Sequence, residues 1–170
     1  VIGHVDTALG FTIPARHARG RLVRIGPVLD AVLANHGYPP VIERLLAEAL
    51  TLTALLGTTL KEAGGQLTLQ AQSQGGCVDL LVCDYKGGEM RGYVRHDAER
   101  LSGLSENPSL VELFGEGYLA ITFDQAVSGE RYQGIVPLDG DTLAEAVQSY
   151  FVQSEQIPSL VRVGIRKGVD

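Results

Sequence analysis

Residues 129–158 read GERYQGIVPLDGDTLAEAVQSYFVQSEQIP, and this stretch carries the signals of a strand, a turn and a helix. Tyr132–Leu138 is predicted to be a strand, because glycines bound an apolar-rich run there. Asp141 or Thr142 is expected to cap the helix, and Thr142 with Glu145 fits a capping box. The proline that closes the stretch is expected to stop the helix. The expected apolar face of this helix consists of Leu143, Val147, Tyr150 and Phe151.

Three more helices are predicted before this unit. Pro27 and Pro40 each follow a turn signal, and proline is well tolerated at the first helical position. The helix from Pro27 is expected to end near Asn35, and Ser109–Phe114 to form a short helix closed by glycine. The helix from Pro40 is apolar almost all round, which is typical of a helix at the centre of a core. Its main stripe consists of Ile42, Leu45, Leu46, Ala49, Thr53, Leu56 and Leu60.

The middle of the chain is punctuated by glycine pairs, which favour an antiparallel meander. Between them, apolar residues of the run 66–72 alternate with glutamine and threonine, so one face of that strand is expected to be buried. Further strands are predicted at Val78–Cys83, Met90–Arg95, Tyr118–Phe123 and Leu160–Ile165. Strands and helices do not alternate regularly. The expected fold is therefore a single α+β domain, mostly antiparallel β-sheets packed with helices.

Composition limits the classes of function. The chain has 170 residues, of which 45% are hydrophobic and 20% charged, as in ordinary globular domains. A net charge of −6 and a pI of about 5.2 argue against a general nucleic-acid binder. No signal-peptide pattern is visible, and the apolar run Ala49–Leu60 is shorter than the ~20 residues that span a bilayer. We therefore expect a soluble, cytoplasmic protein without a membrane partner.

The two cysteines are expected to serve packing. Cys77 and Cys83 lie six residues apart on one expected strand, which separates them by ~20 Å, beyond disulfide reach. Two cysteines alone also cannot complete a structural zinc site with four ligands. Both are therefore predicted to be small apolar residues on one buried face.

Several motifs match a known family in order and identity. They are GERYQG, GDTL and YFVQSEQIP within residues 129–158, ARGRLV at Ala18–Val23, Asn-His-Gly-Tyr-Pro at Asn35–Pro39, and Met-Arg-Gly at Met90–Gly92. In these positions the chain resembles the 33 kDa chaperonin (heat shock protein 33) family, whose members are redox-regulated, ATP-independent holdases. The resemblance covers most of the chain.

The resemblance implies that residues 1–170 correspond to the client-handling N-terminal core domain of the family. Family members also carry a C-terminal module in which Cys-x-Cys and Cys-x-x-Cys pairs hold zinc and sense oxidation, and those pairs are missing here. We expect no zinc or other cofactor in this chain and no enzymatic activity. The implied partners are unfolded or partially folded client proteins. Client-binding residues cannot be identified from the sequence, because leucines in the core and leucines that contact clients look alike in it.

The other motifs that could indicate a cofactor site, a metal site or a catalytic site are weak. The glycine pattern at 115–120 fits a dinucleotide fingerprint but follows a helix and enters a strand, the reverse of the required order. The histidines His4, His17, His36 and His96 share no metal-ligand spacing, and His36 is expected to cap or pack. His96 and Asp97 with Ser102 or Ser154 would be an imaginable hydrolase set, but no nucleophile elbow presents either serine.

Two polar clusters leave alternatives open. The basic run Arg16–Arg24 is either a charged edge strand or a phosphate-binding strip, which makes an RNA-binding module the alternative function. No aromatic residues interleave with these arginines, so nucleic acid is the less favoured partner. Ser154, Glu155 and Gln156 are expected to shape the end of the last helix, with Glu155 pairing with another group such as an arginine, and direct contact with clients is the alternative role. An exposed final strand would favour self-association as a homodimer.

Overall fold

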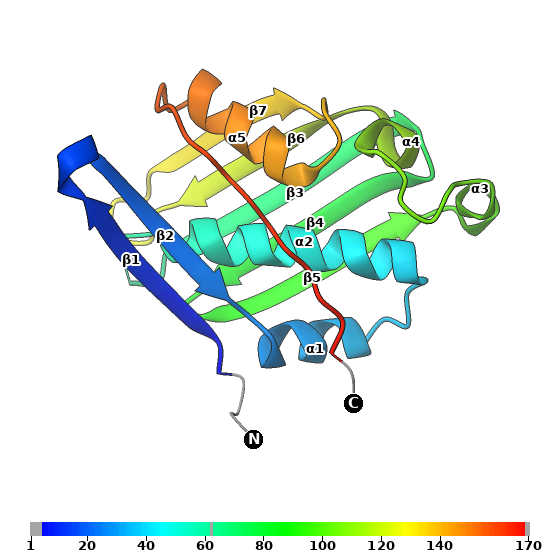
Figure 1. The fold of residues 1–170 in the computed structure, drawn as a ribbon, viewed down its shortest axis with the longest axis horizontal. Helices are drawn as coiled ribbons and strands as arrows, with labels where there is room; N and C mark the ends of the chain where they lie inside the picture. Colours follow the sequence, from blue (N-terminus) through cyan, green and yellow to red (C-terminus); the bar gives the residue numbers. More distant parts are fainter. Residues whose placement is uncertain (1–4, 62, 169–170) are drawn as a thin grey trace.

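The computed structural model describes residues 5–61 and 63–168, which form one layer of helices on one antiparallel sheet, with a separate hairpin beside them (Figure 1). In chain order the elements are β1 (Thr7–Ile13), the 3-10 turn η1 (Pro14–Arg16), β2 (Ala18–Arg24), α1 (Pro27–Ala34), α2 (Pro40–Gly57), β3 (Gln66–Gly75), β4 (Val78–Lys86), β5 (Glu89–His96), α3 (Ala98–Ser102), α4 (Leu110–Phe114), β6 (Gly115–Asp124), β7 (Arg131–Pro137) and α5 (Leu143–Gln153). The expected α+β class with antiparallel sheets is confirmed.

The main sheet has the strand order β5-β4-β3-β6-β7, and every neighbouring pair is antiparallel. The predicted meander is confirmed in β3, β4 and β5, which are joined by tight glycine-containing turns. The expected pairing of β6 with β7 is confirmed, and β6 also pairs with β3 along its whole length, so both strands belong to the main sheet. Leu67, Leu69 and Ala71 are fully buried, as their alternation predicted.

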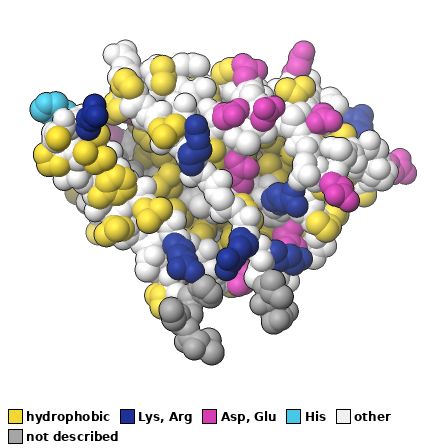
Figure 2. Space-filling view, in the orientation of Figure 1, with side chains coloured by type: hydrophobic (Ala, Val, Ile, Leu, Met, Phe, Trp, Pro, Cys, Tyr) yellow, Lys and Arg dark blue, Asp and Glu magenta, His cyan; other side chains and the backbone are white. Residues whose placement is uncertain are grey.

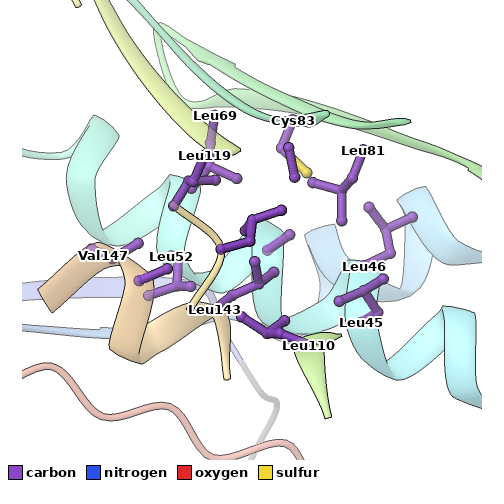
Figure 3. Packing of buried hydrophobic residues seen from close by; sticks show 14 of the residues in the cluster. Leu45, Leu46, Leu52, Leu69, Leu81, Cys83, Leu110, Leu119, Leu143 and Val147 are labelled. Carbon is purple, nitrogen blue, oxygen red and sulfur yellow. The ribbon is translucent and has the colours of Figure 1, made fainter. Parts of the chain in front are cut away.

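The core lies between the sheet and α2, which is the central helix as predicted. α2 contacts β3, β4, β5, α1 and α5. Figure 3 shows side chains of the sheet, such as Leu69 and Leu81, directed toward the layer that contains Leu46 and Leu52 of α2. The buried residues of α2 are Ile42, Leu45, Leu46, Ala47, Ala49, Leu50, Leu52, Thr53, Ala54, Leu56 and Gly57.

Capping by side chains explains where the last two helices begin. Ser109 and Glu112 form a complete capping box at the start of α4. At α5 the Thr142 hydroxyl accepts from the main-chain N–H of Glu145, but the Glu145 carboxylate returns to the N–H of Asp141 at 2.8 Å. The predicted capping box is therefore half formed. α5 also ends earlier than predicted, at Gln153, because Gln156 at φ 55° turns the chain before the proline.

The predicted strand at Leu160–Ile165 is wrong. Residues 157–168 run without strand pairing in front of α2 (Figure 1). The segment lies on the helical layer, where no sheet edge is available, and it is held instead by side chains. The main-chain N–H of Val161 donates to Oε1 of Gln148 on α5 at 3.1 Å. Self-association through a final strand therefore loses its structural basis.

β1 and β2 form a two-stranded hairpin apart from the main sheet. β2 was predicted, whereas β1 was not. Polar contacts join the hairpin to the body: the Arg21 guanidinium donates to the Thr58 carbonyl at 2.7 Å, and the Asp6 carboxylate accepts from the N–H groups of Gly26 and Val28 at 2.7 and 3.1 Å. Within the described ranges, no helix has the length and hydropathy needed to cross a membrane.

Candidate functional site

One side of the β1–β2 hairpin carries a group of exposed apolar side chains. Register places Leu9 opposite Leu22, Phe11 opposite Gly20, and Ile13 opposite Ala18, and directly opposed residues share a face. The four large side chains are 45–60% exposed. We call Leu9, Phe11, Ile13 and Leu22 the hairpin face. Figure 2 shows hydrophobic side chains gathered over this hairpin.

The geometry of the hairpin explains this exposure. A two-stranded ribbon has no second layer of its own, and all seven residues of β1 are exposed. The Phe11 ring lies over Gly20, where an added Cβ would come within 2.1 Å of it. The opposite side of the ribbon faces α2 through Arg21, so the hairpin face points away from the body. It is an apolar surface on an extended arm.

The basic run is divided by the same register. Arg19 and Arg21 lie on the side opposite Leu22, whereas Arg24 lies on the side of Leu22, opposite Thr7. Arg16 and His17 belong to the turn at the tip. The five residues therefore do not form one continuous basic strip, and Phe11 is on the other side of the ribbon from Arg19 and Arg21.

A second apolar surface lies on the outer face of the main sheet, opposite α2. The pairings align Tyr93, Val82, Gln70, Ala120 and Ile135 in one row across all five strands, with Arg95, Leu80, Gln72, Tyr118 and Pro137 in the next. We call Leu80, Val82, Tyr93, Tyr118 and Ile135 the outer-face band. None of the described helices lies over this face (Figure 1).

Charged and polar pairs border the outer-face band. The Asp84 carboxylate, which is buried, accepts from the Thr68 hydroxyl at 2.5 Å and from Nε of Arg91 at 2.6 Å. Arg95 donates to Asp79 at 2.8 Å, and this hydrogen bond lowers the pKa of the Asp79 carboxyl. These partners are satisfied within the sheet. These pairs lie along the border of the outer-face band and do not form a reactive group.

The predicted packing role of the cysteines is confirmed. Cys77 and Cys83 are free, buried and part of the hydrophobic core, but Cys77 lies in the turn before β4 and, contrary to the prediction, does not share a strand with Cys83. Burial raises the pKa of both thiols, so the thiolate that would bind metal or attack an electrophile is disfavoured. Among residues 5–61 and 63–168, no group of three or more His, Cys, Asp or Glu side chains could hold a metal ion.

Two of the histidines, His36 and His96, pack against the same ring, that of Tyr38. The His36 ring stacks on Tyr38, with centroids 4.7 Å apart, which confirms the expected packing role. His96 lies edge-on to Tyr38, and Asp97 caps α3 through the N–H groups of Glu99 and Arg100. His17 lies at the hairpin tip, and His4 is outside the described residues.

The imagined hydrolase set is not assembled. The Ser102 hydroxyl donates to the Glu99 carbonyl at 2.6 Å, and Ser154 is the C-terminal cap of α5. Residues 115–120 pass from α4 directly into β6, so the glycine pattern lacks the helix N-terminus that a dinucleotide needs.

The cluster at the end of α5 differs from its prediction in one contact. Glu155 was expected to pair with an arginine, but its carboxylate accepts from the Tyr150 hydroxyl at 2.8 Å. The hydroxyl of Tyr132 on β7 donates to the Ser154 carbonyl at 3.3 Å. Burial and the Glu155 carboxylate both raise the pKa of Tyr150. The cluster therefore has the expected structural role and anchors the end of α5 to β7.

Sequence reasoning missed Glu48, a carboxylate on the apolar helix α2. Its Oε1 accepts from the main-chain N–H of Ala144, at the start of α5, at 3.0 Å. Burial raises the pKa of the Glu48 carboxyl, against the opposing effect of the main-chain donors Ala144 and Leu143. Glu48 also lines a surface cavity of about 710 Å³ between α1, α2 and residues 161–168. The sequence did contain a signal for Glu48, because an acidic residue is unusual within an almost wholly apolar helix.

Fold and surface together define a class: a single α+β domain that exposes apolar side chains on a hairpin and on a sheet face that no described helix covers. The family model described as Hsp33 protein matches residues 6–169, so this chain belongs to that family.

Relatives of known name agree with this assignment. The chain is 42% identical over 164 residues to the 33 kDa chaperonin of Caulobacter vibrioides (strain NA1000 / CB15N), covering 94% of this chain and 54% of that protein. It is 45% identical over 156 residues to the 33 kDa chaperonin of Yersinia pestis (strain Pestoides F), covering 91% and 50%. The chain thus spans about half the length of these relatives.

A solved structure shows the same fold. The crystal structure of the 33 kDa chaperonin (heat shock protein 33 homolog) from Thermotoga maritima matches with a TM-score of 0.72 at 24% sequence identity. The match covers 89% of this chain and 52% of that chain. At this identity the likeness concerns the fold.

Proposed function

We propose that this domain is the client-binding core of an ATP-independent chaperone, which holds unfolding proteins and prevents their aggregation. The relatives that carry the name chaperonin support the class of function. The hairpin face is the observation that carries the proposal, because it presents four large apolar side chains without a covering layer. An extended apolar segment of a client can pack on it without any particular sequence.

The free energy gained by covering the hairpin face is large enough for weak binding of a client. Covering about 300 Å² of apolar surface, at about 25 cal/mol per Å², would contribute about 7 kcal/mol before the cost of ordering the client. This leaves room for weak, reversible binding. No covalent step is required of the domain.

The chain acts, in this proposal, without zinc and without redox control of its own. Its two thiols do not fit a zinc site, since both are packed in the core with raised pKa values. Regulation by a zinc and cysteine module is a property that the resemblance implies for longer family members.

The test is suppression of light scattering from a chemically unfolded client. Leu9→Ser combined with Leu22→Ser is expected to reduce suppression severalfold while leaving the circular dichroism spectrum unchanged. Val111→Ser on α4 is the matched control, because Val111 is 58% exposed and lies outside both apolar surfaces. It should suppress scattering as well as the unmodified chain.

Two further arms separate the alternatives. If Ile135→Ser loses suppression and the hairpin variant keeps it, the client site lies on the outer-face band instead. Absence of suppression by the unmodified chain would remove the chaperone proposal for this domain. Retention of structured RNA on filters, falling steeply with salt, would support the RNA-binding alternative instead.

A further inference from the structure

β5 is an edge strand of the main sheet, and an edge strand offers unpaired main-chain groups to other chains. Two such groups of β5 are already occupied by side chains. The carbonyl of Gly92 lies 2.8 Å from Nε2 of His36, and the N–H of Val94 donates to the Tyr38 hydroxyl at 2.9 Å. A carbonyl can only accept, so Nε2 of His36 carries the proton in this contact.

Both side chains come from the turn between α1 and α2. Gly37 between them has φ +62°, a left-handed conformation that favours glycine and brings the two flanking rings to the same side. The rings are stacked with centroids 4.7 Å apart and planes 13° apart. The two hydrogen bonds, at 2.8 and 2.9 Å, place both rings against the free edge of β5, where a sixth strand would have to pair.

We propose that His36 and Tyr38 form an edge cap that keeps a second copy of this chain from adding to β5. In an antiparallel pair, opposed residues exchange N–H and C=O groups. The Gly92 carbonyl and the Val94 N–H are groups that an added strand would have to use. The edge cap satisfies both from within the same molecule, so the sheet ends at β5.

Charge indicates how a second copy would pair in the absence of the edge cap. With Gly92 opposite Gly92 of the second copy, Glu89 lies opposite Arg95 of the second copy at both ends of the pairing, and the exposed Arg95 guanidinium can contact Glu89 beside its own partner Asp79. Shifting the register so that Tyr93 faces Tyr93 places Arg91 opposite Arg95, two like charges. The register centred on Gly92 is therefore favoured, and the occupant of an uncapped edge is a second copy.

The hydrogen bond of the edge cap is tested by amide exchange. Tyr38→Phe removes the acceptor of the Val94 N–H and leaves the ring in place, so that amide is expected to exchange about tenfold faster. Tyr118→Phe is the matched control, since its hydroxyl donates to Gln72 on the outer face at 2.8 Å, away from this edge. Unchanged Val94 exchange in Tyr38→Phe would overturn the proposed role of Tyr38.

The role of the edge cap is tested by sedimentation against the unmodified chain. The double variant His36→Ala/Tyr38→Ala is expected to associate at least tenfold more tightly, and adding Glu89→Arg is expected to abolish the gain. A folded double variant with unchanged association would overturn the proposal, as would association that Glu89→Arg leaves intact. If the double variant loses its native circular dichroism spectrum, His36→Ala alone decides, because the His36 side chain is exposed.

Discussion

Glu48 is a carboxylate that serves a helix other than its own, since it accepts from Ala144 at the start of α5. Its pKa is raised by burial, so the folded protein binds the proton more tightly than the unfolded chain does. The contribution of Glu48 to stability therefore falls as pH rises from the ordinary value of 4.5 through the folded pKa, and is constant above it. Glu48→Gln keeps an acceptor for Ala144 but cannot ionise.

We expect the advantage of Glu48→Gln over the unmodified chain to grow across this pH window and then to level off. Urea unfolding at a series of pH values measures it, with Glu48→Ala as the variant that loses the acceptor as well. Glu48→Ala should be destabilised at every pH, because the N–H of Ala144 is left without its partner. Parallel pH profiles for the unmodified chain and Glu48→Gln would contradict the assignment.

The hydrogen bond between Tyr150 and Glu155 joins a buried hydroxyl to a carboxylate at the end of α5. Tyr150 is 1% exposed and its partner is a carboxylate, so Tyr150→Phe should cost about 1.5–3 kcal/mol in free energy of unfolding. Denaturant unfolding measures this loss. Tyr118→Phe, which removes an exposed hydroxyl, should change stability by less than about 1 kcal/mol. Equal effects of the two variants would show that the Glu155 contact is not formed in solution.

At the scale of elements, α5 packs against β7 because β7 has no side chain at Gly134. A Cβ there would come within 2.1 Å of the Tyr150 ring, on the fully buried side of α5. Gly134→Ala should therefore force α5 away from the sheet and cost more than about 1–3 kcal/mol, the usual range for overpacking. Gly10→Ala on the hairpin is the matched control, because nothing lies within 4 Å of its added Cβ.

Thermal unfolding of both glycine variants checks this prediction. Gly134→Ala should lower the midpoint by several degrees, and near-ultraviolet circular dichroism should report a changed environment of Tyr150. Gly10→Ala should leave both measurements unchanged. A midpoint for Gly134→Ala equal to that of the control would mean that α5 adjusts freely on β7.

Elements whose signals are local could be predicted from the sequence. The alternation around Leu67 and Leu69 and the apolar helix from Pro40 were both confirmed, because side-chain period alone identifies which face is buried. The segment Leu160–Ile165 is apolar like a strand, but it lies over helices where no strand can pair with it. The end of α5 depends on the left-handed residue Gln156, which no helix-stop rule identifies.

At the scale of the whole molecule, the candidate site could not be located in advance. Leu9 and Leu22 look in sequence like the buried residues Leu67 and Leu69, and they differ only in what lies opposite them. Leu67 and Leu69 face α2, whereas the hairpin face has no opposing layer. Exposure of an apolar strand is thus a property of tertiary arrangement. The family resemblance indicated binding of unfolded proteins but not the surface.

The same arrangement predicts a hierarchy of local stability in the whole molecule. The hairpin is joined to the body mainly through α2, with the polar contacts of Arg21 and Asp6 at its middle and base. β3 is paired on both sides and covered by α2, so its amides should open only in global unfolding. Hairpin amides should exchange through local opening and orders of magnitude faster, as measured by hydrogen exchange under native conditions.

Asp6→Ala sharpens this prediction, because it removes the acceptor for the N–H groups of Gly26 and Val28 where the hairpin meets α1. The amides of β1 and β2 should then exchange about tenfold faster again, while those of β3 remain unchanged. Asp139→Ala, an exposed carboxylate after β7, is the matched control and should alter neither set. If hairpin and β3 amides exchange with equal free energies of opening, the hairpin belongs to the cooperative core, and its apolar face cannot move independently to meet a client.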